Sequence, residues 1–310
     1  MRKEINFGNE RMSINFLDNI CYSHVTDLSG NPLDLHMSIM LKNGNSEMRL
    51  ALGKDDEPDT TKHPLIVWIP GGGYRGCDKN LMVSEMQFFV EAGFVVASIY
   101  YRSSAQGHYP DQIIDVKTAI RFLRAHAEEY NINPQKVGVI GRSAGGHLAS
   151  MAAMNLSGFD SKEWEGYSSE VQAAIDMFGP NDFCALMFED VKSFGTPGFR
   201  WADHTETHAG AVLGVTKDMS REEMFKLAKK ASASSFVNEK MAPIQILHGD
   251  HDALVNVEIS EAFYKLCVEK GLEEQTELYI LQGAGHGTRE FFQPAVKELM
   301  TGFFKKYLGE

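Results

Sequence analysis

A serine lies between two glycines in the stretch GRSAG, residues 141–145. The four residues before it, VGVI at 137–140, are apolar or small, and the small residues after it favour the start of a helix. A Gly-x-Ser-x-Gly motif between a buried strand and a helix is typical of a nucleophile elbow, a sharp turn that exposes the serine hydroxyl. The motif alone also fits a plain glycine-rich turn, so the chemistry depends on what the rest of the chain supplies.

A serine hydroxyl is a weak nucleophile until a base takes its proton, and a carboxylate usually orients that base. Two later loops offer both groups. The stretch LQGAGHGT at 281–288 contains His286, and LHGDHDALV at 247–255 contains Asp250 and Asp252. We favour Asp252, because it lies further into its loop and can reach the next loop. Asp250 directly follows the strand and Gly249, where it could instead hold the turn through backbone N–H groups.

The stretch WIPGGGYRG at 68–76 contains three successive glycines directly after an apolar strand. Without side chains, their backbone N–H groups can approach a ligand closely. We expect the amides of Gly72, Gly73 and Ala144 to form an oxyanion hole, the set of donors that stabilises negative charge on a carbonyl oxygen during acyl transfer.

Apolar runs of strand length alternate with longer segments of helical periodicity, which predicts βαβ units and a mainly parallel sheet flanked by helices. Active groups in such a sheet lie at the carboxyl ends of the strands. The expected strands are 33–41 (antiparallel), 65–69, 94–101, 136–140, 171–178, 244–248 and 277–281. The expected helices are 111–130, 256–270 with Ile259, Ala262, Phe263, Leu266 and Cys267 on one face, and a C-terminal segment with Phe292, Val296, Leu299 and Phe303 on one face.

Residues 181–242 contain no stretch that predicts a buried strand, although a helical stretch is expected around 221–230. We interpret this region as a cap inserted within a single domain that covers residues 1–310. A disordered linker between two domains is the alternative, but the Trp, Phe and Leu side chains of the region favour burial.

The composition, with 43% hydrophobic and 23% charged residues, is that of a globular protein. A net charge of −12 argues against a nucleic-acid partner. The four cysteines are scattered, so we expect free thiols. No apolar run predicts a signal peptide or a membrane span, and we expect a cytoplasmic protein. His204 and His208 are one helical turn apart, but Thr205 stands where a zinc protease motif has glutamate, so we expect no metal.

These motifs resemble the α/β-hydrolase fold, and within it the esterase branch with an HGGG-type oxyanion loop. That branch includes hormone-sensitive-lipase-like carboxylesterases, acetyl esterases, and bacterial feruloyl- and acetylxylan-esterase-like proteins. The stretches SIYYRSS at 98–104 and 109–149 are similar to the same branch, and the resemblance implies a structural ion pair between Arg102 and Asp115. Pro70 stands where the branch usually has histidine.

The resemblance implies a serine esterase in which Ser143, His286 and Asp252 form the catalytic triad. It would act on small-molecule esters with acetyl, short acyl or hydroxycinnamoyl groups, and would need no cofactor. An amide hydrolase, such as a formamidase or small peptidase, uses the same triad and stays an alternative. A non-catalytic binding protein on the same scaffold is the second alternative, and assembly into a homo-oligomer stays open.

Overall fold

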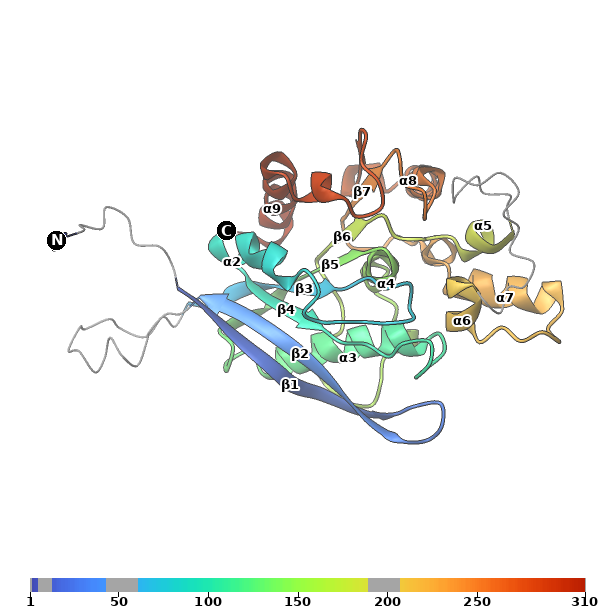
Figure 1. Ribbon diagram of the computed structural model, residues 1–310, viewed down its shortest axis with the longest axis horizontal. Coiled ribbons are helices and arrows are strands. Elements are labelled where there is room, and N and C mark those ends of the chain that lie inside the picture. Colours follow the sequence, from blue (N-terminus) through green and yellow to red (C-terminus); the bar gives the residue numbers. More distant parts are fainter. Residues whose placement is uncertain (1, 5–12, 43–60, 189–206, 310) are drawn as a thin grey trace.

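The computed structural model describes residues 2–4, 13–42, 61–188 and 207–309. Its centre is an eight-stranded sheet in the order β1-β2-β4-β3-β5-β6-β7-β8, with helices on both faces (Figure 1). All seven strands expected from the sequence are present, and β1 is an addition. The strands are β1 (Ile14–Thr26), β2 (Pro32–Lys42), β3 (His63–Ile69), β4 (Val95–Ile99), β5 (Ile132–Arg142), β6 (Ala173–Met177), β7 (Ile244–Gly249) and β8 (Thr276–Leu281).

The sheet from β4 to β8 is parallel, and β1 and β2 add antiparallel to β4 at one side. This is the mainly parallel, helix-flanked sheet of the α/β-hydrolase fold. The described α-helices are α2 (Gln87–Glu91), α3 (Asp111–Ala125), α4 (Ala144–Ala153), α5 (Phe183–Phe188), α6 (His208–Leu213), α7 (Arg221–Ala231), α8 (Val257–Glu269) and α9 (Pro294–Leu308). Short 3₁₀ helices cover Val83–Met86, Ser157–Phe159, Ala233–Phe236, Glu273–Gln275 and Arg289–Phe292.

Two hydrophobic cores lie on the two faces of the sheet. One joins the sheet to α3, α4 and α8, and the other joins it to α2 and α9. The strand residues alternate between these cores, because successive side chains of a strand point to opposite faces. Val139 of β5 belongs to the first core and Ile140 to the second.

Two helix predictions need correction. The helix expected over 111–130 ends at Ala125. In α8, Ala262 is exposed although the sequence predicts it on the inner face, and Ser260 is buried instead. Ser260 is buried because its hydroxyl is a hydrogen-bond partner of His248 at 2.7 Å. A polar residue with a specific partner thus belongs to the buried face, whereas Ala262, two positions further along, lies on a different side of the helix.

Helices α5, α6 and α7 follow β6 and precede β7 in the chain. Figure 1 shows them grouped at one end of the molecule, at the right of the view. The described part of 181–242 contains no strand, as the sequence predicts. No described helix combines the length and the apolar character that a bilayer crossing requires.

Candidate active site

Ser143 lies at the turn between β5 and α4 in a backbone conformation that L-residues rarely adopt, with φ 53° and ψ −121°. Its N–H donates to the carbonyl oxygen of Met177 at 2.8 Å, and its own carbonyl accepts from the N–H of His147 at 3.0 Å. These bonds fix the turn to β6 on one side and to α4 on the other. A strained residue that its surroundings hold so firmly is typical of a functional site.

Neighbouring glycines allow the turn to pack against main chain. A Cβ atom on Gly145 would overlap the carbonyl oxygen of Ile69 at the end of β3, and one on Gly141 would overlap Gly145. A Cβ on Gly71 would lie 2.8 Å from the Arg142 carbonyl oxygen and 3.2 Å from Ser143 Cβ. The elbow and the glycine loop that follows β3 are therefore in direct backbone contact.

The structure brings together the three side chains that the sequence predicts as a catalytic triad. The Ser143 hydroxyl lies 2.9 Å from His286 Nε2, and His286 Nδ1 lies 2.7 Å from Asp252 Oδ2. Because a carboxylate only accepts, Nδ1 carries the proton and Nε2 is free to accept from the serine. The imidazole is held in place by the ring of Phe178, with centroids 4.6 Å apart in an edge-on contact.

The side chain of Asp252 is fully buried and its carboxylate is well supplied with donors. Burial by itself raises its pKa, but hydrogen bonds from His248 and His286 hold that pKa well below its usual range. Oδ1 accepts from the backbone N–H groups of Leu254 and Val255 at 2.8 and 2.9 Å. The carboxylate is therefore charged at neutral pH, which suits it to stabilise an imidazolium.

Asp250 has the other role that the sequence left open. Its Oδ1 accepts from the N–H of Gly283 at 2.7 Å and pairs with His251 at 3.0 Å. It thus joins the loop after β7 to the loop after β8, and its only described contacts are structural.

The glycine loop after β3 is shaped by backbone conformations that favour glycine, with φ 146° at Gly72 and 58° at Gly73. The buried Tyr101 hydroxyl donates to the Pro70 carbonyl at 2.8 Å and anchors the start of the loop. Within the part of the chain that the structure describes, no acceptor is hydrogen-bonded to the N–H groups of Gly72, Gly73 or Ala144. These are the amides that the sequence predicts as oxyanion donors.

A comparison with known protein families identifies the family to which this chain belongs. The BD-FAE family model matches residues 55–266, which is more than half of the chain and includes the glycine loop, the elbow and Asp252. The chain belongs to the BD-FAE family. His286 lies beyond the matched range, so its assignment depends on the geometry above.

This BD-FAE chain is 31% identical over 204 residues to the probable carboxylic ester hydrolase LipM of Mycobacterium tuberculosis, covering 64% of this chain and 44% of LipM. The chain spans 44–60% of the length of LipM, LipC and LipQ, three curated relatives that it matches. Its structure superposes on a truncated carbohydrate esterase from gut microbiota with a TM-score of 0.72, 28% identity and coverage of 95% and 96% of the two chains. An esterase from Thermogutta terrifontis, bound to butyrate, shares the fold at a TM-score of 0.67 and 21% identity, covering 92% and 94%.

Two histidines outside the predicted triad, His248 and His147, support the site in this BD-FAE structure. His248, buried at the end of β7, lies 3.3 Å from Asp252 Oδ2 through Nε2, and the same nitrogen donates to the Val255 carbonyl at 2.9 Å. His248 therefore fixes the loop that carries Asp252. We call the loop that carries Asp252 the acid loop. In the sequence, only the position of His248 directly before the acid loop indicates that it supports this loop.

His147 links three segments of the BD-FAE chain. Its Nε2–H donates to the carbonyl oxygen of Ala231 at the end of α7, at 2.7 Å. Its Nδ1 therefore accepts from the Tyr74 hydroxyl of the glycine loop at 2.8 Å. Burial lowers the pKa of His147 to about 4, so the ring is neutral. The helix α4, the glycine loop and the end of α7 are thus joined by hydrogen bonds to one side chain.

His208 is one of the two histidines whose spacing raised the question of a metal site. It begins α6 and lies against the glycine loop. A Cβ atom on Gly73 would be 3.0 Å from its ring. Burial, with a smaller contribution from Arg75, lowers the pKa of His208. His204 lies outside the described residues.

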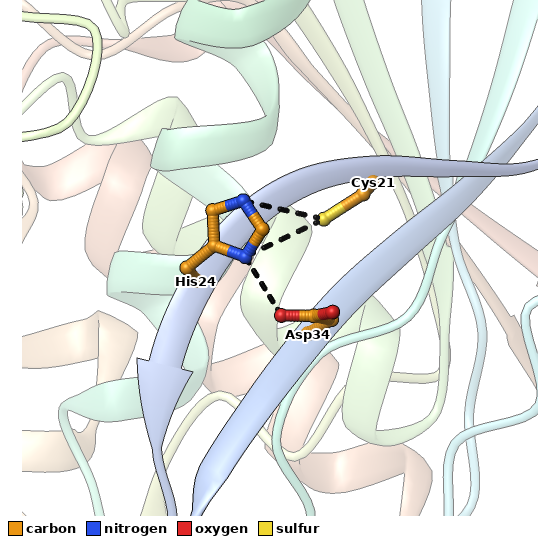
Figure 2. Close-up of side chains that lie close together, drawn as sticks. All are labelled: Cys21, His24 and Asp34. Carbon is orange, nitrogen blue, oxygen red and sulfur yellow. Dashed lines mark hydrogen bonds and ion pairs between the residues drawn. The ribbon is translucent and has the colours of Figure 1, made fainter.

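Among the described residues, one group of side chains has ligand atoms close enough to hold a metal ion, and it belongs to the β1–β2 hairpin (Figure 2). His24 pairs with Asp34 across the strands, with Nδ1 and Oδ1 2.7 Å apart. Cys21 Sγ lies 3.9 Å from His24 Nδ1. The His24–Asp34 hydrogen bond holds these two side chains together. None of the four cysteines forms a disulfide bond, as expected.

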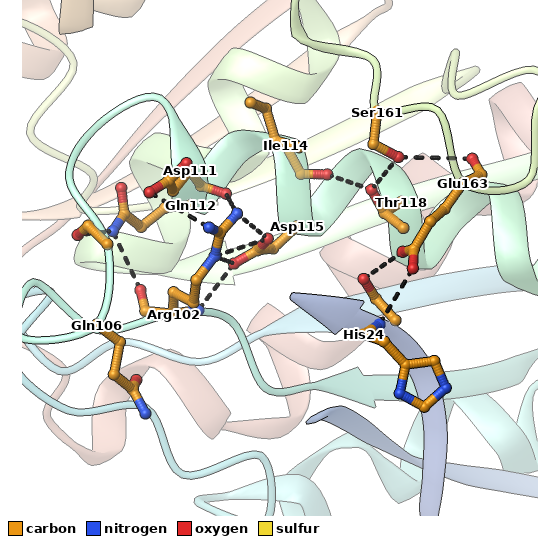
Figure 3. Close-up of polar contacts among 12 residues, drawn as sticks. His24, Arg102, Gln106, Asp111, Gln112, Ile114, Asp115, Thr118, Ser161 and Glu163 are labelled. Carbon is orange, nitrogen blue, oxygen red and sulfur yellow. Dashed lines mark hydrogen bonds and ion pairs between the residues drawn. The ribbon is translucent and has the colours of Figure 1, made fainter. Parts of the chain in front are cut away.

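The ion pair that the family resemblance implies is present. Arg102 Nη2 lies 2.7 Å from Asp115 Oδ1, and Arg102 Nε lies 3.0 Å from Asp115 Oδ2. The Arg102 backbone N–H also donates to Asp115 at 2.9 Å. Figure 3 shows this pair at the start of α3, where it fixes the chain after β4. The ion pair thus has the structural role that the family resemblance implies.

Proposed function

We propose that this chain hydrolyses carboxylic esters with small to medium acyl groups through an acyl-enzyme formed on Ser143. The observation that carries the proposal is the continuous pair of hydrogen bonds from Ser143 to His286 and from His286 to Asp252. A positioned imidazole can take the hydroxyl proton as the oxygen attacks. The names of LipM and of the gut carbohydrate esterase support the same class of reaction, and the latter favours esters of carbohydrates as substrates.

In the proposed mechanism, Ser143 Oγ attacks the ester carbonyl while His286 Nε2 takes the hydroxyl proton. The amides of Gly72, Gly73 and Ala144 stabilise the negative charge on the carbonyl oxygen. Asp252 stabilises the imidazolium, which then donates its proton to the departing alcohol. A water molecule attacks the acyl-enzyme, His286 takes the water proton, and the same proton returns to Ser143 as the acid product leaves.

The described segments between β6 and β7 support the proposal that residues 181–242 cap this site within one domain. Two contacts carry it. His208 of α6 lies against Gly73, and the carbonyl of Ala231 at the end of α7 binds His147. The inserted segment thus touches both the glycine loop and the elbow helix.

A fluorophosphonate probe tests the proposed function directly. The serine oxygen should displace fluoride from the probe, so the native protein should gain the mass of one probe less HF, and Ser143→Ala should gain none, because the reaction requires an activated serine. Parallel assays with an aryl acetate and an N-formyl anilide compare ester with amide hydrolysis. Absence of labelling in the native protein would contradict the proposal and favour a binding protein, and labelling at another residue would contradict Ser143 as the nucleophile. Faster turnover of the anilide would favour a formamidase.

A further inference from the structure

Arg142 directly precedes the proposed nucleophile, and its side chain lies beside the other parts of the site. It ends β5 on the same face as Ile140, because alternate residues of a strand share a face. A Cβ on Gly71 of the glycine loop would lie 3.4 Å from Arg142 Cγ. At the other end of the side chain, a Cβ on Gly287 would lie 2.5 Å from Nη2. The stem thus lies along the glycine loop, and the guanidinium lies against the residue after His286.

The contacts of this guanidinium are weak for a cation. Nη1 contacts the sulfur of Met82, and the group lies 5.8 Å from the centroid of the Phe178 ring. Among the residues that the structure describes, no carboxylate is within ion-pair distance of it. The side chain is half-buried, and this burial is the cause that lowers the pKa of Arg142. A cation that loses water without gaining an anion is unfavourable.

Two other arginines show how this fold satisfies such a group. Arg102 binds the carboxylate of Asp115 through two nitrogens. Arg124 donates to the backbone carbonyls of Pro134, Ser168 and Glu170 at 2.8, 2.6 and 2.7 Å. Arg142 has neither kind of partner among the described residues, although it is the arginine next to the proposed nucleophile. Among the described residues, no oxygen accepts from its guanidinium, which leaves these donors for a ligand to bind.

We propose that Arg142 binds a carboxylate of the substrate, so that the site favours esters whose alcohol part carries an anionic group. The inference rests on the proposed ester hydrolysis. A planar guanidinium binds a carboxylate through two parallel hydrogen bonds. The alcohol part is the one selected, because the guanidinium lies beside the loop of His286, the group that protonates the departing alcohol. Gly287 leaves room for this approach, since any side chain there would meet Nη2.

Matched acetates test this specificity. The substrates are 3-acetoxybenzoate and 3-acetoxybenzamide, which share the acyl group and differ in the charge of the alcohol part. We expect Arg142→Met to lower the ratio of their kcat/KM values, carboxylate over amide, by about 10- to 100-fold, the range for hydrogen bonds to a charged group. Arg142→Lys should restore part of the ratio. Arg289→Met, which removes an exposed arginine near His286, should leave the ratio unchanged.

An unchanged ratio in Arg142→Met, with both substrates slowed alike, would overturn the inference and make Arg142 structural. A native protein that hydrolyses neither acetate would contradict the proposed function instead. Calorimetry then still tests the inference without turnover. 3-Hydroxybenzoate should bind Ser143→Ala, and the affinity should fall at least tenfold in the Ser143→Ala/Arg142→Met double variant. Equal affinity of the two would overturn the anion site.

Discussion

Ser143 lies on a turn that packs against main-chain atoms, whereas Asp252 lies in a loop that side-chain hydrogen bonds hold in place. At the elbow, a methyl group on Gly145 would overlap the carbonyl of Ile69. At the acid loop, His248, His286 and two backbone N–H groups surround a single carboxylate. The difference suggests that the elbow is sensitive to the size of its residues, and the acid loop to their charge and hydrogen-bonding capacity.

The largest effect that this comparison predicts concerns charge in the acid loop. Asp252→Asn keeps the size of the side chain but removes the charge that, in the proposed mechanism, stabilises the His286 imidazolium. We expect kcat to fall by about 10⁴-fold, the loss for a serine protease triad with the same change. The measurement is the steady-state hydrolysis of an aryl acetate at neutral pH.

Asp250→Asn is the matched control, because it makes the same chemical change two residues away. It should lower kcat by less than tenfold, since Asp250 contacts Gly283 and His251 but not His286. Equal losses in the two variants would mean that the loop needs its net charge and not a specific carboxylate.

The next effect concerns size at the elbow. Gly145→Ala should lower the free energy of unfolding by about 3 kcal/mol or more, because the new methyl group meets backbone atoms of β3 that cannot move independently. Urea denaturation measures the change. Gly302→Ala in α9 is the control, since a Cβ there meets nothing within 4 Å, and it should be neutral or slightly stabilising. A stable Gly145→Ala variant would show that the elbow can shift.

The smallest effect concerns His147, which belongs to the elbow but is held by hydrogen bonds. Burial lowers its pKa to about 4, against 6.5 for an ordinary histidine. The unfolded state therefore binds the proton more tightly. The stability from this neutral ring is complete above about pH 6.5 and is lost as the pH falls toward 4, by about 3 kcal/mol at most.

Because other groups titrate in the same range, the measured quantity is a difference between proteins. Unfolding free energies at pH 7 and pH 4.5 should differ less in His147→Gln than in the native protein. His126→Gln replaces a histidine on α3's carboxyl side and should keep the native difference. A His147→Gln protein with the native pH dependence would show that the ring is not the group responsible.

Most strands and the three proposed triad residues could be predicted because their signals are local. Ser143, Asp252 and His286 each lie in a short loop directly after an apolar strand, so strand order alone brings them together. β1 was missed because register shifts, between Leu17 and Ile20 and between Cys21 and Ser23, interrupt its alternation. Much of its length is also exposed, so the hydrophobic pattern that defines a buried strand is absent.

The supporting residues could not be predicted, because their roles depend on partners far along the chain. His147 binds Ala231, 84 residues away, and no local pattern indicates that pairing. Asp250 and Asp252 have similar local sequence, and only the position of the loop after β8 distinguishes them. The environment of Arg142 is likewise set by Met82, Phe178 and Gly287, which come from three different segments.

The imidazole of His147, which is hydrogen-bonded to both Tyr74 and Ala231, restricts how α7 can move. If α7 moved away from the sheet, the ring nitrogen of His147 would lose its acceptor in apolar surroundings, and an unpaired buried donor is costly. Small displacements of α7 away from His147 are therefore resisted. The position of α7 is therefore coupled to the helix after Ser143 and to the glycine loop through this one side chain.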